Sequence, residues 1–287
     1  MKPAGLPISM GDVASALREA AQLFAEISDS PRLDAELLMA HALQIERSEL
    51  LLKLPALTEP SEFAALVERR QRSEPIAHII GRKEFWGLDF QVTPDVLIPR
   101  PDSELLIEEA VRLFASTHPR RILDLGTGSG ALVLAALHEF PEARGLGIDA
   151  SAAVLQIAHN NADALGLADR ASFLLLDWCQ PDWTGSLGSG FDLILANPPY
   201  VASGVRLSAD VADFEPHQAL FAGEQGLDDY AIILPALEKL LSSSGTALLE
   251  IGFDQANPVS EMATKSGYHV ELKQDLSKND RLLILRR

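Results

Sequence analysis

The sequence predicts an α/β protein built on a doubly wound, mostly parallel sheet of about seven strands. A small N-terminal helical bundle and a β-hairpin connector are expected to precede this sheet. Beyond residue 120, short apolar segments alternate with segments of helical periodicity, which is typical of a parallel sheet with helices on both faces. Before residue 73 the apolar residues recur at helical spacing, and between residues 74 and 101 glycines interrupt strand-like segments.

The composition excludes several classes of protein. The 287 residues are 47% hydrophobic, which allows a large domain with a buried core and argues against disorder. The formal net charge of −17 argues against a broad phosphate-binding face. The single cysteine, Cys179, excludes an internal disulfide and a cysteine-based metal site. The N-terminus lacks the apolar core of a signal peptide, and no apolar stretch approaches membrane-spanning length, so we expect a cytoplasmic protein.

We predict a small helical domain over residues 1–73, used for packing or for recognition of a partner. One helix is expected from about Gly11 to Ile27. Another begins at Ser30-Pro31, where serine at the N-cap precedes proline at the first helical position. A further helix is expected to start at Thr58-Glu59-Pro60 and to direct Phe63, Leu66 and Val67 inward. The basic cluster Arg69-Arg70-Arg72 is interpreted as a solvated face rather than a binding patch.

The segment 74–101 is predicted to be a β-hairpin connector. Its strand-like parts are Ala77–Gly81, Glu84–Leu88 and Phe90–Val92, with turns or bulges at Gly81 and Gly87. Pro99 and Pro101 then fix an extended entry to the following domain.

The α/β domain is expected to span residues 102–287. Because the strands are mostly parallel, their carboxyl ends share one edge, and this edge is where such sheets bind ligands. Strands are expected at residues 121–125, 145–149, 172–177, 191–196, 246–251, 268–273 and 281–285, and helices at 103–114, 131–140, 152–165 and 228–241.

A glycine-rich segment follows the first of these strands. Its glycines let the backbone approach a ligand closely, and the next helix offers N–H groups to a carboxylate or phosphate. Asp149 ends the second strand, near the spacing at which an acid binds a ribose diol. This unit favours a nucleoside-containing cofactor over a structural turn. The glycine spacing does not match the dinucleotide fingerprint, whereas S-adenosylmethionine needs only what is present; the segment reads Gly126-Thr127-Gly128-Ser129-Gly130.

Two further acidic or aromatic positions leave alternatives open. Asp177-Trp178 ends the third strand, where a carboxylate could bind the adenine amino group and a ring could cover the base. Trp178 could equally plug the end of the strand. Asp124 could hold the glycine segment or bind the ammonium group of the ligand.

The stretch Asn197-Pro198-Pro199-Tyr200 follows the strand at 191–196. Its prolines prevent a helix and further ladder bonding, so a side-chain amide and backbone carbonyls remain to bind an NH2 group. Taken alone, the stretch could also simply open a turn. Beside a methyl donor, however, the Asn197 oxygen and the Pro198 carbonyl can accept both NH protons of a planar amino group, while Tyr200 stacks on it. A nucleobase and a glutamine or asparagine amide are the candidate substrates.

Other polar residues have weaker assignments. Glu250 is expected to belong to the sheet edge rather than to act as a base. Phe214-Glu215-Pro216 lies in a long loop that could cover the site. The histidines show no metal-ligand spacing, and no metal is expected.

The glycine segment, Asp149 and Asn197–Tyr200 resemble those of class I S-adenosylmethionine-dependent amino methyltransferases, which have a Rossmann-like fold. More narrowly, the chain resembles the PrmC/HemK family of protein-(glutamine-N5) methyltransferases. Asn-Pro-Pro-Tyr is shared with DNA adenine methyltransferases, so the helical domain and connector are the specific part. The resemblance covers nearly the whole chain and includes Arg32–Glu36, Glu74–His78, Glu84–Trp86, Leu97–Asp102, Ile122–Gly130, Phe214–Pro216 and Leu249–Gly252.

The resemblance implies methylation, from S-adenosylmethionine, of the glutamine amide in the Gly-Gly-Gln motif of class I peptide-chain release factors. The helical domain would help to dock the release factor. A monomer is expected, with neither a nucleic acid nor a membrane as partner. By carry-over, Asn197, Pro198 and Tyr200 would be catalytic; Asn197, Pro198, Pro199 and Tyr200 would bind the glutamine; and Gly126, Thr127, Gly128, Ser129, Gly130, Asp149, Trp178 and Asn197 would bind the cofactor.

Two details bear on the substrate. Ser103 stands where the family usually has threonine, and the hydroxyl is retained. The related enzyme that methylates a ribosomal-protein glutamine lacks the Arg100-Pro101-Asp102 run, so the presence of this run favours release factors. The alternative activities are that ribosomal-protein reaction and methylation of an adenine amino group in nucleic acid.

Overall fold

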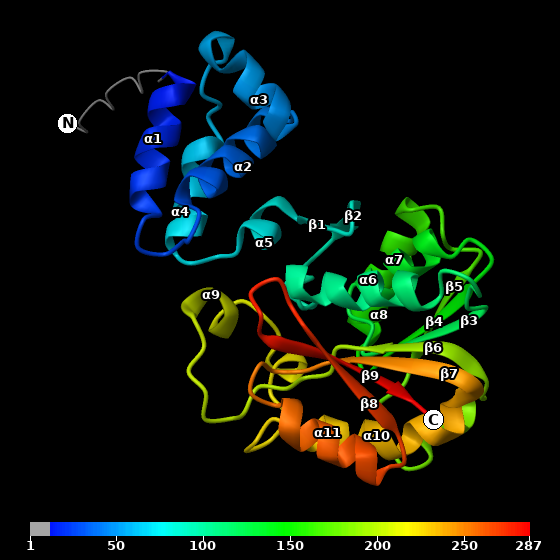
Figure 1. Ribbon diagram of the computed structural model, residues 1–287. Coiled ribbons are helices and arrows are strands. Elements are labelled where there is room, and N and C mark those ends of the chain that lie inside the picture. Colours follow the sequence, from blue (N-terminus) through cyan, green and yellow to red (C-terminus); the bar gives the residue numbers. More distant parts are fainter. Residues whose placement is uncertain (1–11) are drawn as a thin grey trace. The chain divides into compact units, whose positions relative to one another are not determined.

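The computed structural model describes residues 12–287, which form two compact units (Figure 1). The helical unit comprises the described residues up to Gly81 together with Ser208–Phe214. The sheet unit comprises Arg82–Leu207 and Glu215–Arg287. The three-part division at residues 73 and 101 remains a prediction. Within residues 12–287, no helix is both long and apolar enough to cross a membrane.

The helical unit is built around a small apolar core. Leu17, Leu38, Met39, Leu50 and Phe63 are among its buried residues. The helix expected near Gly11 begins at Val13, and Gly11 itself lies outside the described residues. The helices are α1 (Val13–Leu23), α2 (Pro31–Leu43), α3 (Arg47–Lys53), α4 (Phe63–Gln71), α5 (Ile76–Ile80) and α9 (Ala209–Ala212), with the 3-10 turn η1 (Leu54–Ala56).

The basic cluster on α4 is not wholly a solvated face. Arg70 is only 5% exposed; its Nε donates to Asp34 Oδ2 at 2.9 Å and its Nη2 donates to the Ile27 carbonyl at 3.0 Å. Arg69 pairs with Glu74. The prediction was wrong for Arg70 because the buried side of α2 carries an acid, and a buried acid requires a charged partner.

The segment 77–80 is helical, so the prediction of a strand over Ala77–Gly81 was wrong. Helix α5 follows Pro75 and ends at Gly81, whose φ of 74° is the left-handed conformation that terminates many helices. The predicted hairpin follows immediately: β1 (Arg82–Phe85) pairs antiparallel with β2 (Leu88–Gln91). Trp86 and Gly87 both have positive φ in its turn, which confirms the turn predicted at Gly87.

The sheet unit contains the expected seven-stranded, mostly parallel sheet, in the order β5-β4-β3-β6-β7-β9-β8. The run from β5 to β7 is parallel, and β9 is antiparallel to both neighbours. The chain leaves β3 to one side toward β4 and later returns to the other side as β6, so the strand order reverses between the parallel neighbours β3 and β6. The strands are β3 (Arg121–Leu125), β4 (Arg144–Asp149), β5 (Ala171–Leu175), β6 (Phe191–Ala196), β7 (Leu241–Glu250), β8 (His269–Gln274) and β9 (Asp280–Arg286).

Helices cover both faces of this sheet (Figure 1). Ile122 packs into the core formed with α6, α7 and α8, whereas its neighbour Leu123 packs into the core formed with α10 and α11. This alternation buries both faces of the strand, as expected for a parallel sheet. The helices are α6 (Glu104–Leu113), α7 (Ala131–Glu139), α8 (Ala152–Ala164), α10 (Asp228–Leu240) and α11 (Ala256–Lys265), with 3-10 turns η2 (Pro101–Ser103), η3 (Trp183–Ser186) and η4 (His217–Ala219).

Strand register places four polar or flexible positions in one row. Leu125 of β3 pairs with Ile148 of β4 and with Ala196 of β6, and Ala196 pairs with Leu249 of β7. The residues one position further along are therefore level with one another at the carboxyl edge of the sheet. This row consists of Gly126, Asp149, Asn197 and Glu250.

Candidate active site

The glycine turn after β3 is shaped by backbone conformations that favour glycine. Gly126, Gly128 and Gly130 have φ values of 73°, 54° and 83°. The Thr127 N–H donates to the Ile148 carbonyl at 2.8 Å, which ties the turn to β4. A Cβ at residue 126 would lie 3.0 Å from Cη2 of Trp178. The ring of Trp178 therefore lies directly beside the turn.

Asp149 caps the backbone around the glycine turn. Its Oδ2 accepts from the Gly128 N–H at 3.1 Å and its Oδ1 from the Ser151 N–H at 3.0 Å. Burial raises the pKa of this carboxyl above its ordinary value. Each carboxylate oxygen keeps a further lone pair, so Asp149 can still accept from the hydroxyls of a ribose.

Asp124 lies under the same turn. The Thr127 hydroxyl donates to Asp124 Oδ2 at 2.7 Å, so Asp124 does hold the turn, which is one of the two roles left open by the sequence. Its Oδ1 has no well-formed hydrogen bond within the described chain, although the Val133 N–H faces this carboxylate and opposes the effect of burial. Burial raises the pKa of Asp124 to about 7. The structure therefore leaves one buried acceptor beneath the turn.

Thr127 and Ser129, both predicted to bind the cofactor, form hydrogen bonds with other residues of the protein. The Thr127 hydroxyl binds Asp124, as described above, and the Ser129 carbonyl accepts from Asn161 Nδ2 at 2.8 Å. Both side chains are buried. Their assignment to the cofactor stays a prediction, and the main chain of the turn is the part that remains for a ligand.

Trp178 is held by a residue of α10. Its indole N–H donates to Asp229 Oδ1, on α10, at 2.6 Å. Asp177 instead accepts from the Cys179 N–H at 2.8 Å and so caps its own turn. Trp178 is half-buried rather than a fully enclosed plug, which leaves ring surface beside Gly126.

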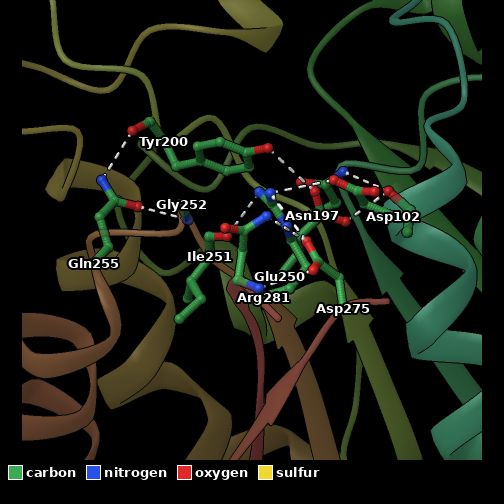
Figure 2. A network of polar contacts seen from close by, with 11 residues as sticks. Asp102, Asn197, Tyr200, Glu250, Ile251, Gly252, Gln255, Asp275 and Arg281 are labelled. Carbon is green, nitrogen blue, oxygen red and sulfur yellow. Dashed lines mark hydrogen bonds and ion pairs between the residues drawn. The ribbon is translucent and has the colours of Figure 1, made fainter. Parts of the chain in front are cut away.

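Asn197 and Tyr200 converge on Glu250 (Figure 2). Asn197 Nδ2 donates to Ser103 Oγ at 3.1 Å, and Ser103 Oγ donates to Glu250 Oε2 at 2.6 Å. The Tyr200 hydroxyl donates to Glu250 Oε1 at 3.2 Å. Glu250 is 1% exposed, and burial raises its pKa to about 7. Burial and the Glu250 charge raise the pKa of Tyr200, so its hydroxyl stays protonated and acts as a donor.

The backbone of the Asn-Pro-Pro-Tyr stretch is braced by Gln255. Its Nε2 donates to the Tyr200 carbonyl at 2.9 Å and to the Gly226 carbonyl at 3.1 Å. Its Oε1 accepts from the Gly252 N–H at 3.0 Å. Pro198 is buried and Pro199 half-buried. The stretch is therefore fixed by tertiary contacts as well as by its prolines.

A cation, the half-buried Arg281, lies beside Glu250. Arg281 Nη2 lies 3.2 Å from Asp102 Oδ2 and 3.6 Å from Asp275 Oδ2, and its Nη1 donates to the Ile251 carbonyl at 3.4 Å (Figure 2). This cation favours the ionised form of Glu250 and opposes the effect of burial.

Glu215 braces the entry to the sheet unit. It is buried, pairs with Arg100 at 2.5 Å and accepts from the Ile98 N–H at 3.3 Å. These bonds join Leu97–Asp102 to Phe214–Pro216, two segments that lie more than a hundred positions apart in the sequence. The sequence assigned Glu215 to a covering loop, and that covering role stays a prediction.

The structure brings most predicted site residues to one edge, and it adds residues that the sequence did not assign. Gly126, Asp149 and Asn197 share the row defined by strand register. Glu250 ends β7, as the sequence indicated, and also belongs to the hydrogen-bond network of the motif. The additional residues are Ser103, Gln255 and Arg281. Of these, only Ser103 had a signal in the sequence, through its retained hydroxyl.

Two family models match the chain. The PrmC N-terminal domain model matches residues 15–81, and a methyltransferase domain model matches residues 117–278. A solved methyltransferase from Pyrococcus furiosus superposes with a TM-score of 0.54 and 18% identity, covering 76% of this chain and 97% of that one. This likeness confirms the class I methyltransferase fold.

Curated relatives extend over almost the whole chain. A release factor glutamine methyltransferase from Caulobacter vibrioides is 39% identical, with 89% of each chain covered. A protein of the same name from Nitratidesulfovibrio vulgaris is 39% identical, with 94% of each chain covered. The resemblance drawn from the motifs is confirmed: this chain belongs to the release factor glutamine methyltransferase family.

Proposed function

We propose that the protein transfers a methyl group from S-adenosylmethionine to the side-chain amide nitrogen (N5) of the glutamine in the Gly-Gly-Gln motif of class I release factors. The observation that carries this proposal is the position of Asn197, level with Gly126 and Asp149 at the carboxyl edge, with its NH2 group bound to Ser103. Relatives that are 39% identical and carry the name release factor glutamine methyltransferase support the choice of substrate.

The residues at the edge fit S-adenosylmethionine. Gly126 leaves a space beneath the Trp178 ring that a Cβ would fill. This space suits a ligand that lies close to the main chain of the turn. Asp149 has lone pairs for ribose hydroxyls, and Asp124 Oδ1 is a buried acceptor for an ammonium group. When bound, the cofactor supplies an electrophilic methyl group. We assign its binding to Gly126–Gly130, Asp149, Trp178 and Asn197.

Orientation of the substrate amide is the main contribution of the protein. An amide nitrogen is a poor nucleophile because its lone pair is delocalised into the carbonyl. Acceptors at Asn197 Oδ1 and the Pro198 carbonyl would bind both NH protons and so direct the lone pair toward the methyl group, while Tyr200 would pack on the amide plane. Such alignment can contribute on the order of 7–11 kcal/mol, so no strong base is needed before transfer.

The helical unit is proposed to help dock the release factor, because the PrmC N-terminal domain model matches residues 15–81 and the catalytic edge lies wholly in the sheet unit. The division at residues 73 and 101 belongs to the same proposal. We further propose a monomer that works in the cytoplasm without binding nucleic acid directly; the net charge of −17 supports the last point.

Incubation with methyl-labelled S-adenosylmethionine tests the proposed substrate. The arms of the experiment are a release factor, the same release factor with its Gly-Gly-Gln glutamine replaced by alanine, and duplex DNA. Label is expected in the intact release factor alone. Label in the DNA alone, or equal label in both release factors, would contradict the proposal.

A further inference from the structure

A relay of hydrogen bonds connects Asn197 to a buried carboxylate. It runs from Asn197 Nδ2 to Ser103 Oγ at 3.1 Å and from Ser103 Oγ to Glu250 Oε2 at 2.6 Å. Ser103 and Glu250 are both buried, so water does not compete for these bonds. The residues come from η2, the end of β6 and the end of β7. The relay therefore depends on the fold rather than on a local motif.

The relay has a direction. An ionised carboxylate can only accept hydrogen bonds, so the single proton of the Ser103 hydroxyl points to Glu250. The Ser103 oxygen then presents lone pairs to Asn197, and within the amide group only the NH2 can bind them. The Asn197 oxygen is consequently turned away from Ser103.

This direction matters for transfer. A glutamine amide that is to be methylated presents N–H donors, and an Asn197 side chain rotated by half a turn would meet them with its own N–H donors. We propose that Ser103 and Glu250 are positioning residues for methyl transfer, which hold Asn197 with its oxygen as the acceptor for the substrate amide. The inference rests on the function proposed above and assigns to Ser103 and Glu250 a role distinct from binding either ligand.

Several charged or titratable groups face Glu250. Arg281 on β9 favours the carboxylate, whereas Asp102 on η2 opposes it. Tyr200 donates to the carboxylate from the loop after β6, and Tyr230 on α10 donates to the Glu250 backbone carbonyl at 2.7 Å. With burial, these groups bring the pKa of Glu250 to about 7.

Protonation of Glu250 reverses the relay. A proton on Oε2 is donated to Ser103, the Ser103 proton then turns to Asn197, and the Asn197 oxygen is drawn away from the substrate. Because the acid form is the inactive one, turnover is expected to fall as the pH decreases through about 7.

The test is the rate of methyl transfer to a release factor at saturating cofactor, measured from about pH 6 to about pH 9. Ser103→Ala breaks the relay, and Ser103→Thr keeps the hydroxyl. We expect Ser103→Ala to lower kcat by about tenfold or more and to abolish the acid limb near pH 7, with the Kd of the cofactor within about twofold of the original. Ser103→Thr is expected to keep both the rate and the limb. Asp124 also has a pKa of about 7 and is present in the unmodified protein and in every variant, so the part of the acid limb assigned to Glu250 is the part that differs between the unmodified protein and Ser103→Ala.

Glu250→Gln provides a second measurement that does not depend on Ser103→Ala folding. Its amide stays neutral at every pH, so the acid limb should disappear here too, and adding Ser103→Ala should cause little further loss, because residues that act as one unit are not additive. An unchanged rate and pH profile for Ser103→Ala, an acid limb in Glu250→Gln as large as in the unmodified protein, or additive losses would overturn the positioning role. Failure of the unmodified protein to methylate the release factor would instead contradict the proposed function.

Discussion

Trp178 packs so closely against Gly126 that a Cβ at residue 126 would lie 3.0 Å from the Trp178 ring. The ring comes from the turn after β5 and the glycine from the turn after β3, so two loops at the carboxyl edge define one narrow space. The indole N–H is anchored to Asp229, which prevents the ring from simply moving aside. The shape of the proposed cofactor site therefore depends on the absence of a Cβ at residue 126.

Gly126→Ala should weaken binding of S-adenosylmethionine by about tenfold or more, equivalent to about 1.4 kcal/mol, because the new methyl group displaces Trp178 and fills the space beside it. Calorimetric titration measures this change. Gly166→Ala is the matched control: Gly166 has a similar φ of 69°, and nothing lies within 4 Å of the added Cβ. Both variants should lose stability through backbone strain, but only Gly126→Ala should lose affinity. Equal affinities would remove the Trp178–Gly126 space from the cofactor site.

Asp229→Ala should release the Trp178 ring and raise the Kd of the cofactor about three- to tenfold, because only part of the roughly 1.5–3 kcal/mol of a hydrogen bond to a charged group is transmitted to the cofactor through the ring. Asp229→Asn retains an oxygen acceptor at the same position and should recover most of the affinity. Fluorescence or calorimetric titration of both variants tests this anchoring. The same Kd in Asp229→Ala as in the unmodified protein would show that Trp178 needs no anchor.

Asp124 should make the free energy of unfolding depend on pH. Burial raises its folded-state pKa from 3.8 to about 7, so the folded protein binds a proton that the unfolded chain has already released between these values. The contribution of Asp124 to stability therefore decreases as the pH rises from about 4 to about 7 and is constant above that. Asp124→Asn, which can still accept from Thr127, should flatten this part of the profile. Urea unfolding at a series of pH values checks it, and an identical slope in both proteins would contradict the raised pKa.

Arg70→Met should destabilise the helical unit by about 3–5 kcal/mol, because it leaves the buried Asp34 carboxylate without its partner. Arg72→Met is the control, since the Arg72 side chain is 72% exposed and lies 3.7 Å from an equally exposed Glu68. That change should alter stability by no more than about 0.5 kcal/mol. Thermal unfolding followed by circular dichroism distinguishes the two, and equal shifts in Tm would mean that the Arg70–Asp34 pair contributes nothing beyond a surface contact.

The sequence was most informative where one local pattern determines the structure. Strands β3 and β6 lie at the predicted bounds, because each is a short apolar run that ends at a glycine turn or at prolines. Helix α5 was mistaken for a strand because Ala77–Ile80 is too short to show a helical period. Its proline start and its Gly81 end were the better signal.

The residues that surround Asn197 could not be found in this way. Ser103 and Glu250 are separated by 147 positions, and Arg281 is brought to them only by the antiparallel strand β9. Their contact follows from strand order and register, which no local pattern encodes. Helix α11 was not predicted either, although Pro258 lies in its first turn, where proline is tolerated.

Mass spectrometry of release-factor peptides tests the central claim most directly. The release factor is incubated with S-adenosylmethionine and either the unmodified protein or Asn197→Ala, whose affinity for the cofactor is checked in parallel by calorimetry. We predict one methyl group on the Gly-Gly-Gln glutamine with the unmodified protein. With Asn197→Ala we predict a loss of at least about a hundredfold in rate at saturating cofactor, with a much smaller loss of cofactor affinity, because Asn197 is only one of the residues assigned to cofactor binding. Undiminished methylation by Asn197→Ala, or a methyl group on another residue, would contradict the account.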